Sequence, residues 1–533
     1  MRTAEPKVTD QTSDTAPARW AEFVRELFWV VMPLVGLALY LLCNTHESLW
    51  LDEVYSLAAS NPAFSPADIW RLTATDVHPP LYFELLWLVR TVAGPSIFVA
   101  RVFSALGACI LLWLGAGPLR RALGDKVAQI FLLLTLLCPA ILAYAQDVRM
   151  YTWTAAAVLG MVVHIFLAVR DGRRSDWVKT GLFMCAAMYL HMYGLMAAFW
   201  TAIFCLVYTA GWRRDRLMPC LIVLGAAGVA FLPWCLVLAG QVDRVNAGFW
   251  IPPVSRKGIL AFLVYPFGFK FHAPMRAVWT FALVCASALF GCFAARREAG
   301  ATRFSGLCLG VYGATFGGAL LVSVIAQPIL VARYALSLVG LLLTLAAVGL
   351  ARLRAPVRVV VLIAIIALEF PMLREVVRQR FNGPMREVAA YLEPQLRSGD
   401  FILHTDPQTL GTFAWYLPAC TQVVYDPKSQ WKATDLPPLP NVVVVTNLAD
   451  LHIRTRGCWL ASRPCAPPLM PLEEEWHRAY LDTANYFGFT APRAKIVKGQ
   501  PYANAAMEFT LPRSWYTVVL ERIPAVDAIR VER

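Results

Sequence analysis

Long apolar runs constrain this chain more than any other feature of its sequence. A helix needs about 20 mostly apolar residues to cross the hydrocarbon core of a bilayer, and eleven stretches before residue 375 are candidates. They centre near Val35, Leu111, Leu134, Val158, Ala186, Phe204, Val229, Leu283, Val311, Leu341 and Ile365. Charged residues make up only 16% of the chain, whereas soluble domains carry about 25%. The sequence therefore predicts a mainly α-helical membrane protein with about 11 transmembrane helices.

The charges between these runs predict the orientation of the chain. Alternate loops are strongly basic, and the intervening loops carry more acids and fewer cations. The basic loops hold Arg120, Arg121 and Lys126; Arg170, Arg173, Arg174 and Lys179; Arg213, Arg214 and Arg216; Arg296, Arg297 and Arg303; and Arg352, Arg354 and Arg358. Because basic loops stay in the cytoplasm, the N-terminus is expected there and the chain beyond the last run outside. This distribution accounts for the net charge of +13 without a nucleic-acid partner.

The chain divides into three parts by composition. Residues 1–26 are polar and predict a disordered cytoplasmic tail, and residues 27–374 form the transmembrane module. Residues 375–533 predict a small outer α/β domain, with "FILHTD", "NVVVVTN" and "SWYTVVLERI" as strands and "PMREVAAYLEPQL" as an amphipathic helix. Cys458 and Cys465 lie in this domain, and they form a disulfide only if it faces an oxidising compartment.

Two of the outer loops are long. In the first, residues 44–83, the segment "SPADIW" offers Ser65 as an N-cap and Pro66 at the first helical position, which predicts a short surface helix. The second, residues 242–276, is rich in Pro, Gly and aromatic residues.

Five outer segments, distant in sequence, carry polar residues at an apolar boundary. They are "LWLDEVYS" with Asp52, Glu53 and Tyr55, "TATDVHPPLYFELL" with Asp76, His78 and Tyr82, "YAQDVRMYTW" with Asp147 and Arg149, "LHMYGL" with His191 and Tyr193, and "LVARYALS" with Arg333 and Tyr334. Because all five lie on one predicted membrane face, we expect them to share a pocket.

Each of these residues also has a simpler interpretation. His191, between two spans, fits a loop residue more often than a ligand, and Arg333 could close a helix or extend to the membrane surface. Acids in outer loops are usually solvated charges, and aromatic residues at helix ends are usually interfacial anchors. We expect these simpler roles for Asp68, Asp243, Tyr151 and Trp153.

The grouped residues suit one kind of chemistry. A carboxylate next to a hydroxyl can remove its proton as the oxygen attacks. Arginine can hold a lipid phosphate through paired, charge-assisted hydrogen bonds. Acids and cations at one outer membrane surface therefore indicate group transfer from a lipid-linked phosphate, since ATP and nucleotide sugars are absent from the periplasm.

At these residues the chain resembles the GT-C superfamily of membrane glycosyltransferases, in the branch of the protein O-mannosyltransferases and the lipid A aminoarabinose transferases. The resemblance lies in the order of "WLDE" after the first run, "HPPLYF" entering the second, "YAQDVRMY" after the third, "HMYG", and a late "ARY". It covers about the first 350 residues, and the C-terminal domain resembles the family only in its position.

The resemblance implies an inverting, single-displacement glycosyltransferase with a polyprenyl-phosphate sugar, such as undecaprenyl-phosphate hexose or pentose, as donor. The acceptor would be a hydroxyl of an envelope glycolipid, glycan or protein at the periplasmic face of a bacterial inner membrane. Asp52 would be the general base, with Glu53 shaping the site and Asp147 opposite, orienting acceptor or sugar. The enzyme would be a monomer and require no cofactor.

The resemblance also implies contacts to the donor. Its phosphate would be bound by His78, Arg149, Arg333 and Tyr334, with Tyr55 and Tyr82 lining the site and Lys270 as a weaker candidate. His191 and Tyr193 would line the acceptor or sugar pocket. His78-Pro79 stands where aminoarabinose-transferase-like members have Lys-Pro, which disfavours aminoarabinose transfer to lipid A. A divalent cation held by Asp52, His78 and Asp147 is a weaker alternative.

Two other function classes compete with this one. A lipid or sugar transporter or flippase would use the acids as coupling groups, and it predicts charges near the membrane midplane and inverted repeats. A non-catalytic lipid-binding or assembly protein predicts that substitution of Asp52 leaves activity intact.

Overall fold

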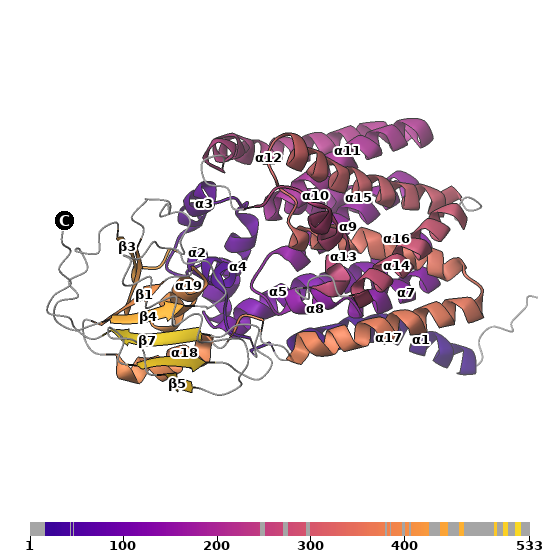
Figure 1. The fold of residues 1–533 in the computed structure, drawn as a ribbon. Helices are drawn as coiled ribbons and strands as arrows, with labels where there is room; N and C mark the ends of the chain where they lie inside the picture. The colour runs from indigo at the N-terminus through magenta and orange to yellow at the C-terminus, as the bar shows by residue number, and fades with distance from the viewer. Residues whose placement is uncertain are drawn as a thin grey trace, which may run out of the picture.

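The computed structural model of this chain is a helical bundle that carries a β-sheet at one end (Figure 1). The residues it describes are 16–42, 44–45, 47–245, 251–269, 275–294, 299–378, 381–383, 385–396, 400–404, 407–425, 438–445, 458–462, 495–497, 505–509 and 518–523. We call the sheet end the outer end, after the predicted orientation.

Within the described residues, nine helices are long and apolar enough to cross a membrane, or ten if a bent pair counts as one span. The nine spans are α1 (Ala16–Leu41), α5 (Ile97–Leu114) continued by η1 (Gly115–Leu119) and α6 (Arg120–Leu123), α9 (Tyr151–Asp171), α11 (Met192–Trp212), α12 (Leu217–Val245), α14 (Met275–Ala294), α15 (Ala299–Ile325), η4 (Ala332–Leu338) continued by α16 (Val339–Arg352), and α17 (Ala355–Arg378). The bent pair is α7 (Asp125–Leu136) and α8 (Pro139–Ala145), which meet at 65°. The chain is thus a mainly α, multi-pass membrane protein, as predicted.

One of the predicted spans, the run near Ala186, is present as a helix that is shorter than these nine spans. The run near Ala186 forms α10 (Arg174–Leu190), which has only 17 residues and ends at His191. The short η2 (Arg214–Arg216) joins α11 to α12. The π-helical η1 lies near the C-terminal end of the α5–α6 span and contains Pro118, which cannot donate the usual backbone hydrogen bond.

The helix α1 begins earlier than the predicted end of the tail at residue 26. It starts at Ala16, and its first turns carry the Glu22–Arg25 pair on one face. The carboxylate of Glu26 accepts hydrogen bonds of 3.0 and 2.7 Å from both terminal nitrogens of Arg120, which fastens this part of α1 to α6.

The first outer loop contains three helices, α2 (Leu51–Ala59), α3 (Pro66–Thr75) and α4 (Leu81–Ala93). The helix predicted after Ser65 is confirmed as α3, and it has a full capping box between Ser65 and Asp68. Asp68 is solvent-exposed, as predicted. No side-chain cap announces α2, whose N-cap residue is Trp50. The second long outer loop contains α13 (Arg256–Gly268).

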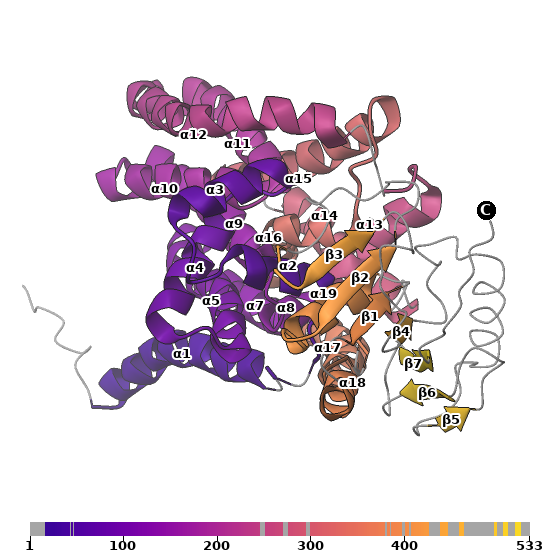
Figure 2. The same ribbon diagram turned by 90° about the vertical axis from the view of Figure 1, so that its left-hand side faces the viewer.

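The C-terminal part forms a seven-stranded mixed sheet in the order β3-β2-β1-β4-β7-β6-β5 (Figure 2). Its elements are α18 (Met385–Leu392), η5 (Glu393–Gln395), β1 (Phe401–His404), α19 (Pro407–Tyr416), β2 (Thr421–Tyr425), β3 (Val442–Val445), β4 (Cys458–Ser462), β5 (Lys495–Val497), β6 (Ala505–Phe509) and β7 (Val518–Ile523). Strands β3, β2, β1 and β4 are parallel, and the rest pair antiparallel. The three predicted strands and the predicted helix are confirmed. Cys465 lies outside the described residues, so the disulfide stays a prediction.

The sheet domain meets the membrane module at α2. Both views place α19 next to α2 (Figures 1 and 2). The domain therefore borders the helix that carries the acid pair.

Candidate active site at the outer end of the bundle

The carboxylate of Asp52 lies between two guanidinium groups. Asp52 is in the first turn of α2, where the helix dipole favours an acid. Its Oδ2 atom is 3.9 Å from Arg149 Nη2 and 3.6 Å from Arg333 Nη2, and its side chain is 23% exposed. Both distances are ion-pair contacts longer than a hydrogen bond. The carboxylate is therefore attracted by two cations without forming a close hydrogen bond to either.

Arg149 is fixed in place by three groups. It lies in the turn between α8 and α9, where Nη1 donates hydrogen bonds of 3.2 Å to the Asp52 carbonyl and to Ser56 Oγ. Its Nη2 atom lies 3.1 Å from His78 Nε2. Burial alone would lower the pKa of Arg149, but the Asp52 carboxylate raises it above the ordinary value. Among the described residues, none accepts a hydrogen bond from the buried Nε of Arg149.

His78 holds Arg149 in a chain that begins at Asp76. An arginine can only donate hydrogen bonds, so His78 Nε2 accepts and the ring proton is on Nδ1. Nδ1 then donates to Asp76 Oδ2 at 3.0 Å. Burial alone would raise the pKa of Asp76, but His78 and Arg149 lower it below the ordinary value. In this arrangement both nitrogens of His78 are engaged, so it orients Arg149 where the sequence predicted a contact to phosphate.

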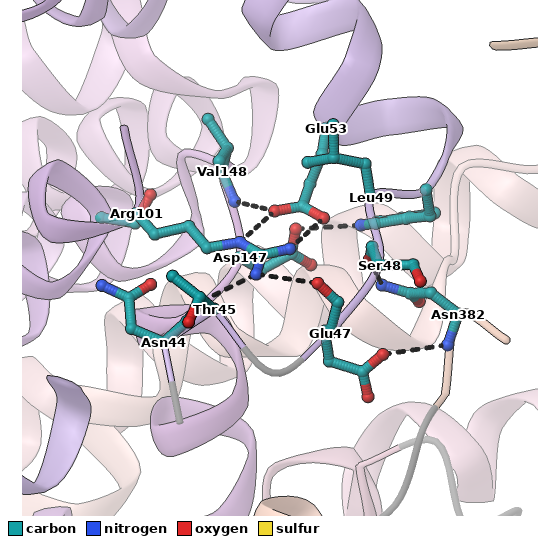
Figure 3. Close-up of polar contacts among 12 residues, drawn as sticks. Asn44, Thr45, Glu47, Ser48, Leu49, Glu53, Arg101, Asp147, Val148 and Asn382 are labelled. Atoms are coloured by element: carbon teal, nitrogen blue, oxygen red, sulfur yellow. Dashed lines mark hydrogen bonds and ion pairs between the residues drawn. The ribbon is translucent and has the colours of Figure 1, made fainter. Parts of the chain in front are cut away.

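Glu53 points toward Arg101 and Val148 in the protein interior (Figure 3). Its two oxygens accept hydrogen bonds of 2.9 and 3.0 Å from Arg101 of α5, and Oε1 also accepts the Val148 N–H at 3.0 Å. Both side chains of the pair are 1% exposed. Successive residues of a helix point about 100° apart, so the acid pair splits between two environments. Glu53 was predicted to shape the site beside Asp52; these contacts make it an anchor of α2, and a direct part in catalysis stays a prediction.

Asp147 contacts the residue that caps α2. Its Oδ1 accepts a 2.9 Å hydrogen bond from the indole nitrogen of Trp50. The Trp50 ring in turn lies 5.8 Å from the guanidinium carbon of Arg333. Asp147 thus contributes to the same end of α2 as Asp52, and its predicted contact with acceptor or sugar stays a prediction.

Aromatic rings gather beside the arginines. His191 lies 4.6 Å from the Tyr334 ring and 5.9 Å from the His78 ring, between centroids. Its Nδ1 accepts the Tyr193 N–H at 3.0 Å, which caps α11. Tyr151 is fully buried, 5.7 Å from His191, so the interfacial role predicted for it is wrong.

Trp153 also has an internal partner. Its indole nitrogen donates a 2.9 Å hydrogen bond to the Phe103 carbonyl, and the two rings stack at 4.7 Å. This tie to α5 replaces the purely interfacial role that its position at a helix end predicted.

The remaining predicted residues are tyrosines with different partners, and one lysine. Tyr334 packs 5.7 Å from the Arg333 guanidinium. Tyr55, on α2, contacts Phe83 edge-on, and burial followed by the charge of Asp76 raises its pKa well above the ordinary value. Tyr82 is buried, with its hydroxyl 2.9 Å from Ser104 Oγ, so it does not line the site as predicted but joins α4 to α5. Lys270 lies outside the described residues.

Three residues of this cluster were not predicted from the sequence. Trp50 and Arg101 were not considered, and Asp76 was noted without a role. Arg101 had a detectable signal, because it is a charge close to the start of an apolar span, where ionisable residues are rare and usually paired. Nothing in the sequence distinguishes Trp50 from other boundary tryptophans.

The weaker alternative of a divalent cation stays a prediction. No three His, Cys, Asp or Glu side chains gather into a metal-binding group anywhere in the described ranges. Both nitrogens of His78 are engaged, and Asp52 faces two cations.

Comparisons with known proteins agree with this fold. The family model described as dolichyl-phosphate-mannose-protein mannosyltransferase matches residues 77–237. ArnT from Cupriavidus metallidurans in the apo state is 14% identical with a TM-score of 0.58, covering 96% of this chain and 99% of that one. The same protein bound to undecaprenyl phosphate is 15% identical with a TM-score of 0.55, covering 95% and 98%. No curated protein matches the chain in sequence. The predicted resemblance to the GT-C superfamily is confirmed, and the chain has the GT-C fold.

Proposed function

We propose that this GT-C protein is a glycosyltransferase that moves a sugar from a polyprenyl-phosphate donor to an acceptor hydroxyl at the outer membrane face. The observation that carries the proposal is the position of the Asp52 carboxylate between Arg149 and Arg333. A base and two phosphate-binding cations side by side are what such a transfer requires. The chain also resembles a protein whose structure contains undecaprenyl phosphate.

The two arginines would bind the donor phosphate. Arg149 is held by the α2 backbone, Ser56 and His78, so it is preorganised, and its Nε is a buried donor without a hydrogen bond among the described residues. A phosphate oxygen would satisfy that donor. Arg333 approaches from another segment at the start of η4, so together they could grip two oxygens of one phosphate.

Asp52 would act as the general base in a single displacement. It removes the proton of the acceptor hydroxyl while that oxygen forms a bond to the anomeric carbon. The bond between the anomeric carbon and the phosphate oxygen breaks, and polyprenyl phosphate leaves with the electron pair. Attack from the opposite side inverts the configuration. The arginines stabilise the negative charge that develops on the departing phosphate.

The other residues around Asp52 would position this machinery. The Glu53–Arg101 pair anchors α2, Asp76 and His78 orient Arg149, and Asp147 acts through Trp50. His191, Tyr193 and Tyr334 would form an aromatic wall for the sugar or acceptor, and Lys270 stays a further candidate for the phosphate. We propose no metal or other cofactor.

The cellular location and the orientation that we propose are those predicted from the sequence. The N-terminal tail would lie in the cytoplasm of a bacterium, the transmembrane module in its inner membrane and the C-terminal domain in the periplasm. The acceptor would be an envelope glycolipid, glycan or protein, and the enzyme a monomer. The transporter alternative has less support, because the charged cluster lies at one end of the bundle.

The test compares Asp52→Asn with Asp68→Asn, an exposed acid of the same loop. Purified protein in proteoliposomes is supplied with undecaprenyl-phosphate hexose or pentose, and envelope lipids and proteins from cells lacking the gene serve as acceptors. Mass spectrometry of the acceptors measures transfer. We expect Asp52→Asn to insert normally and lose nearly all transfer, while Asp68→Asn retains it. Near-normal turnover by Asp52→Asn would remove the base assignment.

A further inference from the structure

We propose that the C-terminal domain is a positioning element of the active site. It would act through residues 47–50, which we call the strap and which lead directly into α2. The inference rests on the proposed function in one respect, that Asp52 at the start of α2 is the base. We infer in addition that the position and orientation of the Asp52 carboxylate depend on contacts made by a domain far away in sequence.

The C-terminal side of the molecule holds the strap through both backbone and side chains. The carboxylate of Glu47 accepts the N–H groups of Phe381 and Asn382 at 2.8 and 3.3 Å. The Asn382 amide donates to the Ser48 carbonyl at 2.9 Å, and Ser48 Oγ accepts the Arg386 N–H at 3.2 Å. Figure 3 shows Asn382 next to Glu47, on the side of the strap away from Glu53.

Leu49 is held by α19. Its N–H donates to the Tyr416 hydroxyl at 3.1 Å, and its carbonyl accepts the Thr412 hydroxyl at 3.3 Å. Ser48 and Leu49 are both fully buried. Because a buried backbone group without a partner is costly, these contacts fix the path of the strap.

The membrane module holds the opposite side of the same residues. Arg101 donates to the Glu47 carbonyl at 3.1 Å, and the Trp50 indole donates to Asp147 at 2.9 Å. The strap itself is neither helix nor strand. Its conformation is therefore set by two partners, the bundle on one side and the C-terminal domain on the other.

The C-terminal end of α2 is connected to the same domain through Arg90. Arg90 of α4 donates to the Ser60 carbonyl at 2.8 Å and to Ser60 Oγ at 2.9 Å, just beyond the last turn of α2. The Arg90 guanidinium also lies 5.8 Å from the ring of Trp415 on α19. Both ends of α2 thus contact groups that touch α19, so a shift of α19 would turn the helix that carries Asp52.

The position of a base affects turnover more than donor binding. A misplacement of about 1 Å can cost about 100-fold in rate. Arg333 binds the phosphate from a segment outside α2, and Arg149 lies outside α2 but is hydrogen-bonded to it. Weakening the strap should therefore lower kcat by a larger factor than it raises the KM for the donor.

The experiment uses two full-length variants and one control. Asn382→Ala removes the hydrogen bond to Ser48, and Tyr416→Phe removes the acceptor of the Leu49 N–H with almost no change of shape. Gln395→Ala is the control, since its exposed amide donates to the Tyr391 carbonyl, away from the strap. Transfer kinetics with undecaprenyl-phosphate sugar are measured together with hydrogen–deuterium exchange of the α2 amides.

We expect a loss of about tenfold or more in kcat for both variants, a smaller change in the KM for the donor, and faster exchange in α2, with no change for Gln395→Ala. Wild-type kcat and wild-type exchange in the near-isosteric Tyr416→Phe would overturn the proposal, as would a rise in donor KM at constant kcat. If the wild-type protein transfers no sugar while α2 exchange still accelerates in the variants, the proposed function fails and the positioning role of the C-terminal domain stands.

Discussion

The buried Glu53–Arg101 pair offers the sharpest test of how the site is held together. Arg101 makes four hydrogen bonds, two to the Glu53 carboxylate and one each to the carbonyls of Asn44 and Glu47. The pair is almost inaccessible to water. Removal of one partner from a buried pair costs about 3–5 kcal/mol, because it leaves an uncompensated charge.

The double variant should cost far less than the sum of its parts. Glu53→Ala and Arg101→Ala are each expected to lower the free energy of unfolding by about 3–5 kcal/mol. With both charges gone, the remaining cost comes from backbone groups such as the Val148 N–H, at about 1–3 kcal/mol for each group that water cannot reach. The double variant should therefore resemble either single one, with a coupling energy of about 3–5 kcal/mol.

The measurement is a denaturant titration in detergent micelles, followed by tryptophan fluorescence, for the wild-type protein, the two single variants and the double variant. Losses that add to within about 0.5 kcal/mol would mean that the two groups do not interact and would refute this account. A Glu53→Ala variant with wild-type stability and no activity would instead return Glu53 to a direct catalytic role.

Three further predictions concern single residues. Arg333→Ala should weaken binding of polyprenyl phosphate by about 10- to 150-fold, the equivalent of one charge-assisted contact of about 1.5–3 kcal/mol; isothermal titration with undecaprenyl phosphate measures it, and unchanged affinity would remove this contact. His78→Gln should retain more transfer than His78→Ala, because a glutamine amide can still accept from Arg149 and donate to Asp76; equal kcat values for the two variants would count against the orienting role. Burial lowers the pKa of His404 to about 4, below the value of about 6.5 in an unfolded chain. Between these two pH values the unfolded state binds more protons, so the free energy of unfolding decreases as the pH falls. The C-terminal domain should lose up to about 3 kcal/mol as the pH falls from 6.5 to 4, in thermal unfolding scans, and His404→Gln should remove this dependence.

The elements of the fold could be predicted from the sequence because each has a local cause. Apolar length gives the spans, Ser65 and Pro66 announce α3, and alternating or continuous apolar residues announce the strands. The helix α2 escaped prediction because no side chain caps its start. Its stability comes from contacts that the sequence does not display, such as those of Arg149 with Ser56 and of Arg90 with Ser60.

Some of the residues that form the site could be predicted from the sequence, but the role of each residue within it could not. Asp52, Arg149 and Arg333 come together as expected from segments far apart in sequence. The roles of Glu53, His78 and Tyr82 depend on which partners their polar atoms find, and those partners lie on other helices.

Asp52 and Glu53 differ in exposure and in hydrogen bonding, and this difference gives a physical reason for two adjacent acids at the start of α2. A carboxylate that must accept a proton needs access to the acceptor and loose contacts, as Asp52 has with its 3.6 and 3.9 Å ion pairs. A carboxylate that must hold a helix in place needs close, dry contacts, as Glu53 has with Arg101. Because consecutive helical residues diverge by about 100°, the pair at the start of α2 meets both needs within one turn. The exchange Asp52→Glu together with Glu53→Asp keeps the charge and composition but changes both reaches, and it should therefore lose stability as well as transfer.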